Sequence, residues 1–73
     1  MSALRKAILK SCRFHYCKVA MVIGRTSREM KNEQSEFLEE IAGEISALVE
    51  EGVLHSWGDI TQWRHSEVRI NPM

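Results

Sequence analysis

The chain has 73 residues, 44% of them apolar, and its ten basic side chains balance its ten acidic ones. This length allows one small domain, which buries only about 60% of the surface that its unfolded chain exposes. A shaped catalytic cleft would use up much of so small a core, and two cysteines are too few for a disulfide framework. We therefore expect a single domain that is not an enzyme and has no cofactor.

The N-terminal segment does not look like a secretion signal. Its apolar run from Ala7 to Leu9 ends at Lys10, which is too short for the hydrophobic part of a signal peptide. No window approaches the roughly 20 apolar residues that span a bilayer. Free cysteines fit a reducing compartment, so the sequence predicts a cytoplasmic protein without a membrane partner.

The charges are divided unevenly along the chain. Residues 1–31 hold eight of the ten Lys and Arg against a single acid, and residues 32–73 hold nine acids against two bases. Either two oppositely charged helices lie side by side, or the basic half faces an acidic partner such as a phosphate backbone. The first interpretation is favoured, because no linker separates the two halves.

Residues 3–31 predict a basic helical region. Apolar residues recur there on one helical stripe, which comprises Leu4, Ile8, Cys12, Tyr16, Val19, Ile23 and Met30. The phase of the stripe is continuous, so one long helix and two helices broken near residues 11–14 fit equally well. Phe14 and Met21 lie off the stripe and indicate a second contact surface.

Residues 35–51 show the clearest helical pattern, an apolar stripe opposite an arc of glutamates. Asn32 or Ser35 can cap its first turn, and Gly52 can end it in the left-handed conformation. The connection from Lys31 is short, so the two helical regions should pack antiparallel.

That packing predicts internal ion pairs. In an antiparallel helical hairpin Arg25 would lie near Glu40, and Arg28 would lie near Glu36. Such exposed pairs contribute only about 0–1 kcal/mol each, so they would set the register of the helices more than their stability.

Residues 53–70 predict a two-stranded hairpin. One strand runs from Val53 to Trp57 and the other from Glu67 to Ile70, with apolar and polar residues alternating in the second. The expected fold is therefore α+β and winged-helix-like, a helical hairpin followed by a wing. Its expected core comprises Val19, Ala20, Ile23, Leu38, Ile41, Ile45, Leu48, Val49, Leu54, Val68 and Ile70.

The segment from Tyr16 to Ile70 resembles a bacterial domain family of unknown function, which usually forms the C-terminal module of longer proteins. The resemblance rests on residues 18–24, on residues 41–54, and on a closing segment with Gly58, Asp59, Arg64 and residues 66–70. It implies a winged-helix-like end module with no activity and no assigned catalytic residues.

Two clusters could in principle carry chemistry. Cys12, His15 and Cys17 are soft-metal ligands, but in a helix the two thiols would point about 140° apart and could not share a tetrahedral ion. We therefore expect incidental thiols and no metal site.

The hairpin carries His55, Asp59, His65 and Glu67, the minimum equipment for acid–base catalysis. No activated nucleophile or glycine-rich phosphate loop accompanies them, and Gly58 with Asp59 more simply forms a turn in which Asp59 binds backbone N–H groups ahead of it. We therefore expect no catalytic site.

Two sets of residues are candidates for partner contacts. The candidates for a protein partner are Leu4, Ile8, Phe14, Trp57 and Trp63; the two tryptophans could equally cover the edge of a thin core. The candidates for phosphate contacts are Lys6, Lys10, Arg13, Lys18 and Arg25.

A non-catalytic protein-interaction or regulatory module is the favoured function. In DNA-binding winged helices the helix before the wing enters the major groove. Here that helix carries glutamates, and no Lys or Arg occurs from Asn32 to Trp63. Non-specific nucleic-acid binding through the basic N-terminal helix is the alternative.

We also expect the chain to form a homodimer and to bind a further protein partner that the sequence does not identify. One long N-terminal helix would overhang the acidic helix and leave Leu4, Ala7, Ile8 and Phe14 without an internal partner, which a second copy could bury. If the helix instead breaks near residues 11–14 and folds back, the chain would be a monomer.

Overall fold

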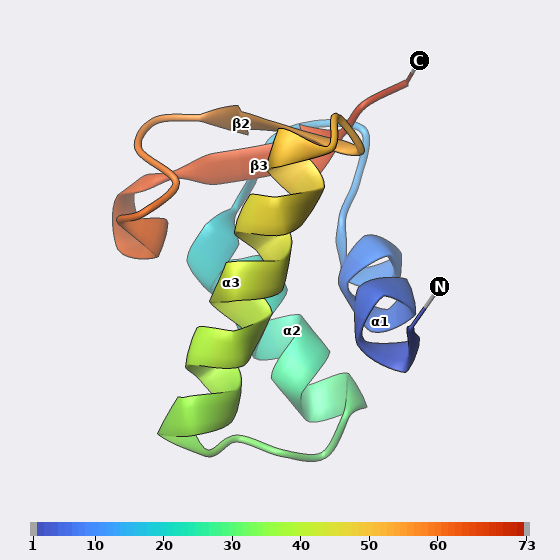
Figure 1. Ribbon diagram of the computed structural model, residues 1–73, viewed down its shortest axis with the longest axis vertical. Helices are drawn as coiled ribbons and strands as arrows, with labels where there is room; N and C mark the ends of the chain where they lie inside the picture. Colours follow the sequence, from blue (N-terminus) through green and yellow to red (C-terminus); the bar gives the residue numbers. More distant parts are fainter. Residues whose placement is uncertain (1, 73) are drawn as a thin grey trace.

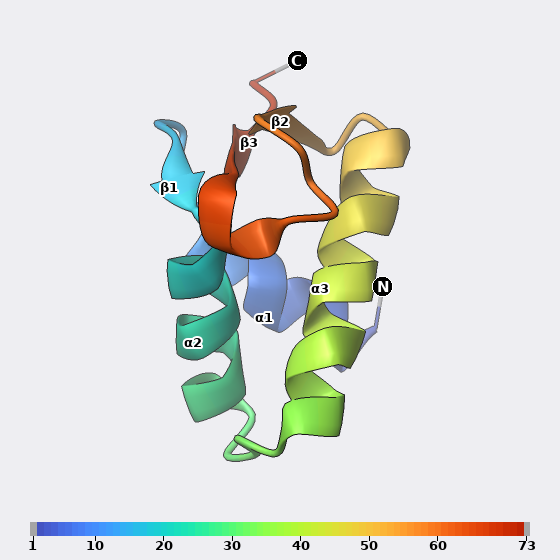
Figure 2. The same ribbon diagram turned by 90° about the vertical axis from the view of Figure 1, so that its left-hand side faces the viewer.

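A computed structural model describes residues 2–72 of the chain. Within this range the elements are α1 (Ala3–Ser11), β1 (Cys17–Lys18), α2 (Val19–Glu29), α3 (Ser35–Glu50), β2 (Leu54–Trp57), the 3-10 turn η1 (Trp63–His65) and β3 (Glu67–Ile70). The three strands form an antiparallel sheet across one end of the helices (Figure 1). Figure 2 shows α2 and α3 running antiparallel, with α1 behind them. The predicted α+β class is confirmed.

The helical region expected over residues 3–31 is two helices with a strand between them. α1 is capped at its start by Ser2 Oγ, and it ends where Cys12 becomes extended (φ −89°, ψ 165°). The following segment leaves helical geometry to bond with the far end of the chain, since Ile70 N donates to Arg13 O at 2.8 Å. The two helices bury apolar residues that continue the same periodic pattern. The pattern alone therefore could not distinguish one long helix from two.

The sheet has one strand more than the predicted hairpin. Its order is β1-β3-β2, with Cys17 opposite Val68 and Ser56 also opposite Val68 on the other side. β1 contributes only two residues and carried no strand signal of its own. The last of the three strands is thus the central one.

The end of α3 follows the prediction. Gly52 adopts a left-handed conformation with φ 81°. Gly52 N donates to Val49 O at 3.1 Å and Val53 N donates to Leu48 O at 3.0 Å. These two bonds are the Schellman pattern, which satisfies carbonyl groups that the helix end would leave unpaired.

The core lies between the three helices and the inner face of the sheet. Its buried apolar residues are Ala7, Ile8, Cys12, Cys17, Val19, Val22, Ile23, Ile41, Ile45, Leu48, Leu54 and Val68. Of the predicted core, Ala20, Leu38, Val49 and Ile70 are only partly buried. The members that the prediction missed come mainly from residues 7–17, because α1 folds back over the other two helices.

That folding back removes the overhang from which the homodimer was predicted. Ala7 is 6% exposed and Ile8 is fully buried within one chain, so Ile8 is not a partner contact. The accessible surface of 4752 Å² is close to the roughly 4600 Å² expected for a monomeric protein of this mass. The fold therefore closes its core without a second copy.

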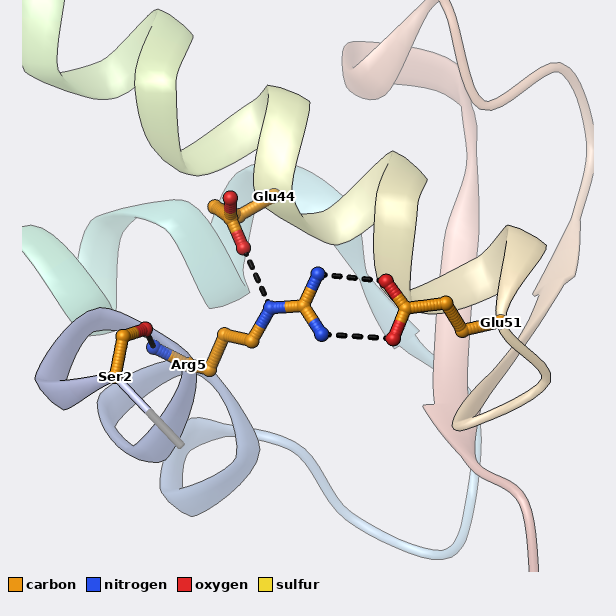
Figure 3. A network of polar contacts seen from close by, with 4 residues as sticks. All are labelled: Ser2, Arg5, Glu44 and Glu51. Carbon is orange, nitrogen blue, oxygen red and sulfur yellow. Dashed lines mark hydrogen bonds and ion pairs between the residues drawn. The ribbon is translucent and has the colours of Figure 1, made fainter.

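Arg5 fixes α1 against the C-terminal half of α3 (Figure 3). Its Nε donates to Glu44 at 2.7 Å, and its two terminal nitrogens donate to the Glu51 carboxylate at 2.8 and 2.7 Å. These bonds hold the pKa of Glu51 below its ordinary value. The cation also offsets the unfavourable position of Glu51 at the negative end of the helix dipole.

The ion pairs predicted between α2 and α3 are wrong. Among residues 2–72 the observed pairs are those of Arg5 and one between Lys10 and Glu29 at 3.1 Å. Arg25 Nη1 instead donates to Ser11 O at 3.2 Å, at the end of α1. The prediction failed because α1 packs beside α2 and supplies a nearer acceptor.

Truncating Ile8 tests whether α1 is part of the core. Replacing this fully buried side chain by alanine should lower the free energy of unfolding by about 2–5 kcal/mol. Lys6→Ala, an exposed change on the same helix, should stay within about 0.5 kcal/mol of the wild type. Urea denaturation of both variants decides; equal midpoints would mean that α1 is not docked.

Two glycines of opposite character test the backbone of α3. Gly43 is exposed inside the helix, with open space where a Cβ would lie, so Gly43→Ala should stabilise the fold by about 0.5–1 kcal/mol. Gly52→Ala should destabilise it by about 1 kcal/mol or more, because its positive φ strains an L-residue. Thermal unfolding should shift in opposite directions; a stabilising Gly52→Ala would contradict the left-handed helix end.

Candidate interaction surface

The outer face of the sheet is the candidate site. Side chains alternate along each strand, so Cys17, Leu54 and Val68 face the helices and are buried. Their neighbours in the strands point the other way, to a side that no helix covers in either view (Figures 1 and 2). We call this surface the outer sheet face; it comprises Tyr16, Lys18, His55, Trp57, Glu67 and Arg69.

The strand register arranges these side chains in two rows. In the first row, Glu67 lies opposite Lys18 on one side and Trp57 on the other. In the second row, Arg69 lies opposite His55, and its guanidinium lies over the ring of Tyr16, 5.2 Å from the ring centre. Each row thus has a charged residue on the central strand and an aromatic side chain at one edge.

The aromatic side chains of this face are open to solvent. Trp57 is 65% exposed and Tyr16 is 38% exposed. Tryptophan, tyrosine and arginine are the types enriched at energetic hot spots of protein interfaces. The Trp57 indole, on the edge strand of this face, is exposed to water, and a partner that covered it would gain the free energy of its burial.

Arg69 has unused hydrogen-bonding capacity. Its Nε is buried and has no hydrogen-bond partner within residues 2–72, while its guanidinium lies over the Tyr16 ring. A buried donor without an acceptor costs about 1–3 kcal/mol. Because this Nε is buried, an acceptor on a partner would have to bind the terminal nitrogens of the guanidinium.

The structure separates the predicted protein contacts. Trp57 lies on the outer sheet face. Phe14 is 65% exposed and lies in the connection between α1 and β1, two residues before Tyr16. Trp63 is half-buried in η1 with the Arg64 guanidinium 5.1 Å from its ring centre. Leu4 and Trp63 are partly buried and pack against the core. For Trp63 this agrees with the interpretation that it covers the edge of a thin core.

The predicted phosphate contacts do not form one helix. Lys6 and Lys10 lie on α1, Arg13 follows it, Lys18 lies on β1 and Arg25 on α2. Lys10 pairs with Glu29, and Arg13 and Arg25 donate to backbone carbonyl groups. Only Lys18 belongs to the outer sheet face.

The predicted turn at Asp59 is confirmed. Asp59 Oδ1 accepts from Thr61 Oγ1 at 2.6 Å and from Thr61 N at 3.0 Å. These bonds hold the pKa of the Asp59 carboxyl below its ordinary value. Within residues 2–72, no hydrogen bond joins His55 or His65 to a carboxylate.

The cysteines are not held in a helix, so the angular reason given against a metal site does not apply. Cys12 and Cys17 are both buried and free, and Cys17 Sγ donates to His15 O at 3.7 Å. In the described part of the chain, no three side chains of His, Cys, Asp or Glu lie close enough to hold a metal ion.

The sequence analysis did not predict Tyr16 and Arg69 as residues of the candidate interaction surface. Tyr16 was assigned to a helical stripe, because the two-residue strand that turns it outward leaves no periodic signal. The outward direction of Arg69 was visible in the alternation of β3, but its stacking on Tyr16 depends on a pairing between distant segments.

Comparison with protein-family models, with curated proteins and with solved structures finds no match for this chain. The resemblance to a bacterial domain family therefore stays a prediction. In residues 2–72 no helix has the length and apolar character needed to cross a bilayer. The function has to be inferred from the geometry.

The Cys12 thiol gives a pH test of the packing at the α1–β1 connection. Burial, and then the neighbouring Cys17, raise the pKa of Cys12 from 9.0 to about 11. The folded state therefore keeps a proton that the unfolded state releases, so stability is full below pH 9 and falls as pH rises to about 11.

The measured slope should identify this thiol. Between pH 9 and 11, urea denaturation should show that the free energy of unfolding falls with pH in both proteins. The fall should be on the order of 2 kcal/mol smaller in Cys12→Ala than in the wild type. Every other ionisable group is present in both proteins, so the comparison isolates the Cys12 thiol. Equal slopes would show that Cys12 is accessible to water in the folded state.

Proposed function

We propose that this chain is a non-catalytic protein-interaction module that binds its partner through the outer sheet face. The observation that carries the proposal is the exposed Trp57 on the same open face as the stacked pair of Tyr16 and Arg69. Aromatic anchors beside an arginine with unused donors are the composition of an interface centre. The two free cysteines support a cytoplasmic setting.

The order of the elements supports a winged-helix-like assignment for the module. A helical hairpin leads through α3 directly into the antiparallel pair of β2 and β3, which would be the wing. The helix before the wing carries glutamates on its exposed side, as Glu36, Glu39 and Glu40 show. Such a surface suits a basic protein segment better than a phosphate backbone.

Nucleic-acid binding is the less supported alternative. It would show as a gel shift of generic duplex that weakens steeply between roughly 50 and 200 mM salt. Charge reversal at Lys10 and Arg13 should abolish that shift if the basic residues of α1 and its following segment carry it. A protein-interaction module should give no such shift.

A homodimer remains a proposal on a different basis. Since α1 is docked within its own chain, the surface available to a second copy is the outer sheet face, where the charges of the first row could pair across a two-fold axis. Lys18 of one copy would then face Glu67 of the other. Light scattering on a size-exclusion column measures the mass directly.

Trp57→Ala tests the proposed face. Because the side chain is 65% exposed, its loss should change the free energy of unfolding little. A hot-spot tryptophan contributes about 2 kcal/mol or more to binding, so the affinity for the co-purifying partner, or for the second copy, should fall more than about tenfold.

Met21→Ala is the matched control, because Met21 is a large apolar side chain, 47% exposed, that lies on α2 and not on the sheet. It should leave both the complex and the mass unchanged. If the two variants bind equally well, or if only Met21→Ala dissociates the complex, the outer sheet face is not the interface.

A further inference from the structure

A second feature adjoins the outer sheet face, a surface pocket of about 230 Å³ between β1, η1 and the start of β3. It is lined by Lys18, Arg64, His65, Ser66 and Glu67. Lys18 and Glu67 also belong to the outer sheet face, so a chain that lies on that face reaches the pocket. We call it the Lys18–Arg64 pocket.

We propose that the Lys18–Arg64 pocket binds the phosphate group of a phosphorylated residue in the protein partner. The identity of the carrier rests on the proposed function, whereas the affinity of the pocket for phosphate does not. Three observations carry the inference: the charge of the pocket, an unpartnered hydroxyl at its wall, and the helix end beside it.

The charge of the pocket favours an anion. A lysine, an arginine and a histidine line it, against the single carboxylate of Glu67. Neither Lys18 nor Arg64 takes part in an ion pair among residues 2–72, since those pairs use Arg5 and Lys10. The Arg64 guanidinium lies over the Trp63 ring, 5.1 Å from the ring centre, a contact that leaves its N–H donors free for a ligand.

Ser66 supplies a polar group that the fold itself does not use. It is 2% exposed, lines the pocket, and its Oγ has no hydrogen-bond partner within the described residues. A buried hydroxyl without a partner is unfavourable by about 1–3 kcal/mol. Because the Oγ atom is itself buried, the side chain would have to rotate about χ1 for a phosphate oxygen in the pocket to accept its proton.

The N-terminal end of α2 lies at the same place. Its N-cap residue is Lys18, whose side chain makes no capping bond, and its first N–H, from Val19, donates to Ser66 O at 3.0 Å. α2 has no acidic residue in its first turn. The positive end of its dipole is therefore not neutralised by the helix and adds to the attraction for an anion.

The test is a titration followed by ¹H–¹⁵N NMR at constant ionic strength, with inorganic phosphate and with N-acetyl-O-phosphoserine amide as probes. We expect saturable shifts at residues 18–20 and 64–67 with both probes. Arg64→Ala should weaken binding roughly twofold to fivefold, and Glu67→Gln should strengthen it because it removes the one acid of the pocket.

Arg28→Ala is the charge-matched control, since it removes a cation from the last turn of α2, outside the pocket. It should leave the binding unchanged. Shifts that do not saturate, or an equal loss in Arg28→Ala and Arg64→Ala, would mean that the protein attracts anions without a site and would overturn the inference.

Ser66→Ala separates binding from folding. The variant should keep or raise the free energy of unfolding, because it removes a buried polar group without a partner, and it should still weaken phosphate binding. A loss of stability with unchanged binding would show that the hydroxyl serves the fold and not the ligand.

Two further comparisons separate the carrier from the site. If a single-stranded oligonucleotide bound more tightly than the phosphoserine probe and lost its affinity in Arg64→Ala, the carrier would be a nucleic acid, and the proposed partner would be wrong. If phosphate fails to bind while Trp57→Ala still dissociates the partner, only the pocket inference fails. If phosphate binds while Trp57→Ala has no effect, only the proposed face fails.

Discussion

The backbone pairing between residues 13–19 and residues 66–70 is the constraint on which the rest of the structure depends. Arg13 O accepts from Ile70 N, Cys17 pairs with Val68, and Val19 N donates to Ser66 O. These bonds draw the chain out of helical geometry after Ser11. α1 is thereby free to turn back over the other helices and bury Ile8, and the sheet gains its third strand.

The same pairing decides which charges are left for a partner. Because α1 turns back over the other helices, its Arg5 forms ion pairs with Glu44 and Glu51, and its Lys10 forms one with Glu29. These contacts pair two of the ten basic side chains with three acids inside one domain. Of the cations without an ion pair among residues 2–72, Lys18 and Arg69 lie on the sheet and Arg64 lies in η1, whereas the others lie on α1, on α2 or in the connections.

The parts of the fold that were predictable are those with a local signal. The α3 stripe, the Schellman end at Gly52 and the alternation of β3 each follow from residues that are near one another in sequence. β1 has only two residues, so no period can reveal it, and its existence depends on β3. The exposed Trp57 could be suspected from its type, but Tyr16 could not, because the strand that turns it outward is itself a long-range effect.

The central place of β3 also has a consequence for the order of events during synthesis. β1 leaves the ribosome early and β2 later, but neither has a strand beside it until residues 67–70 have emerged. The contacts between α2 and α3 are local and can form first, whereas pairing between distant segments is slow. The outer sheet face is therefore assembled last, so a nascent chain has no completed surface with which to capture a partner prematurely.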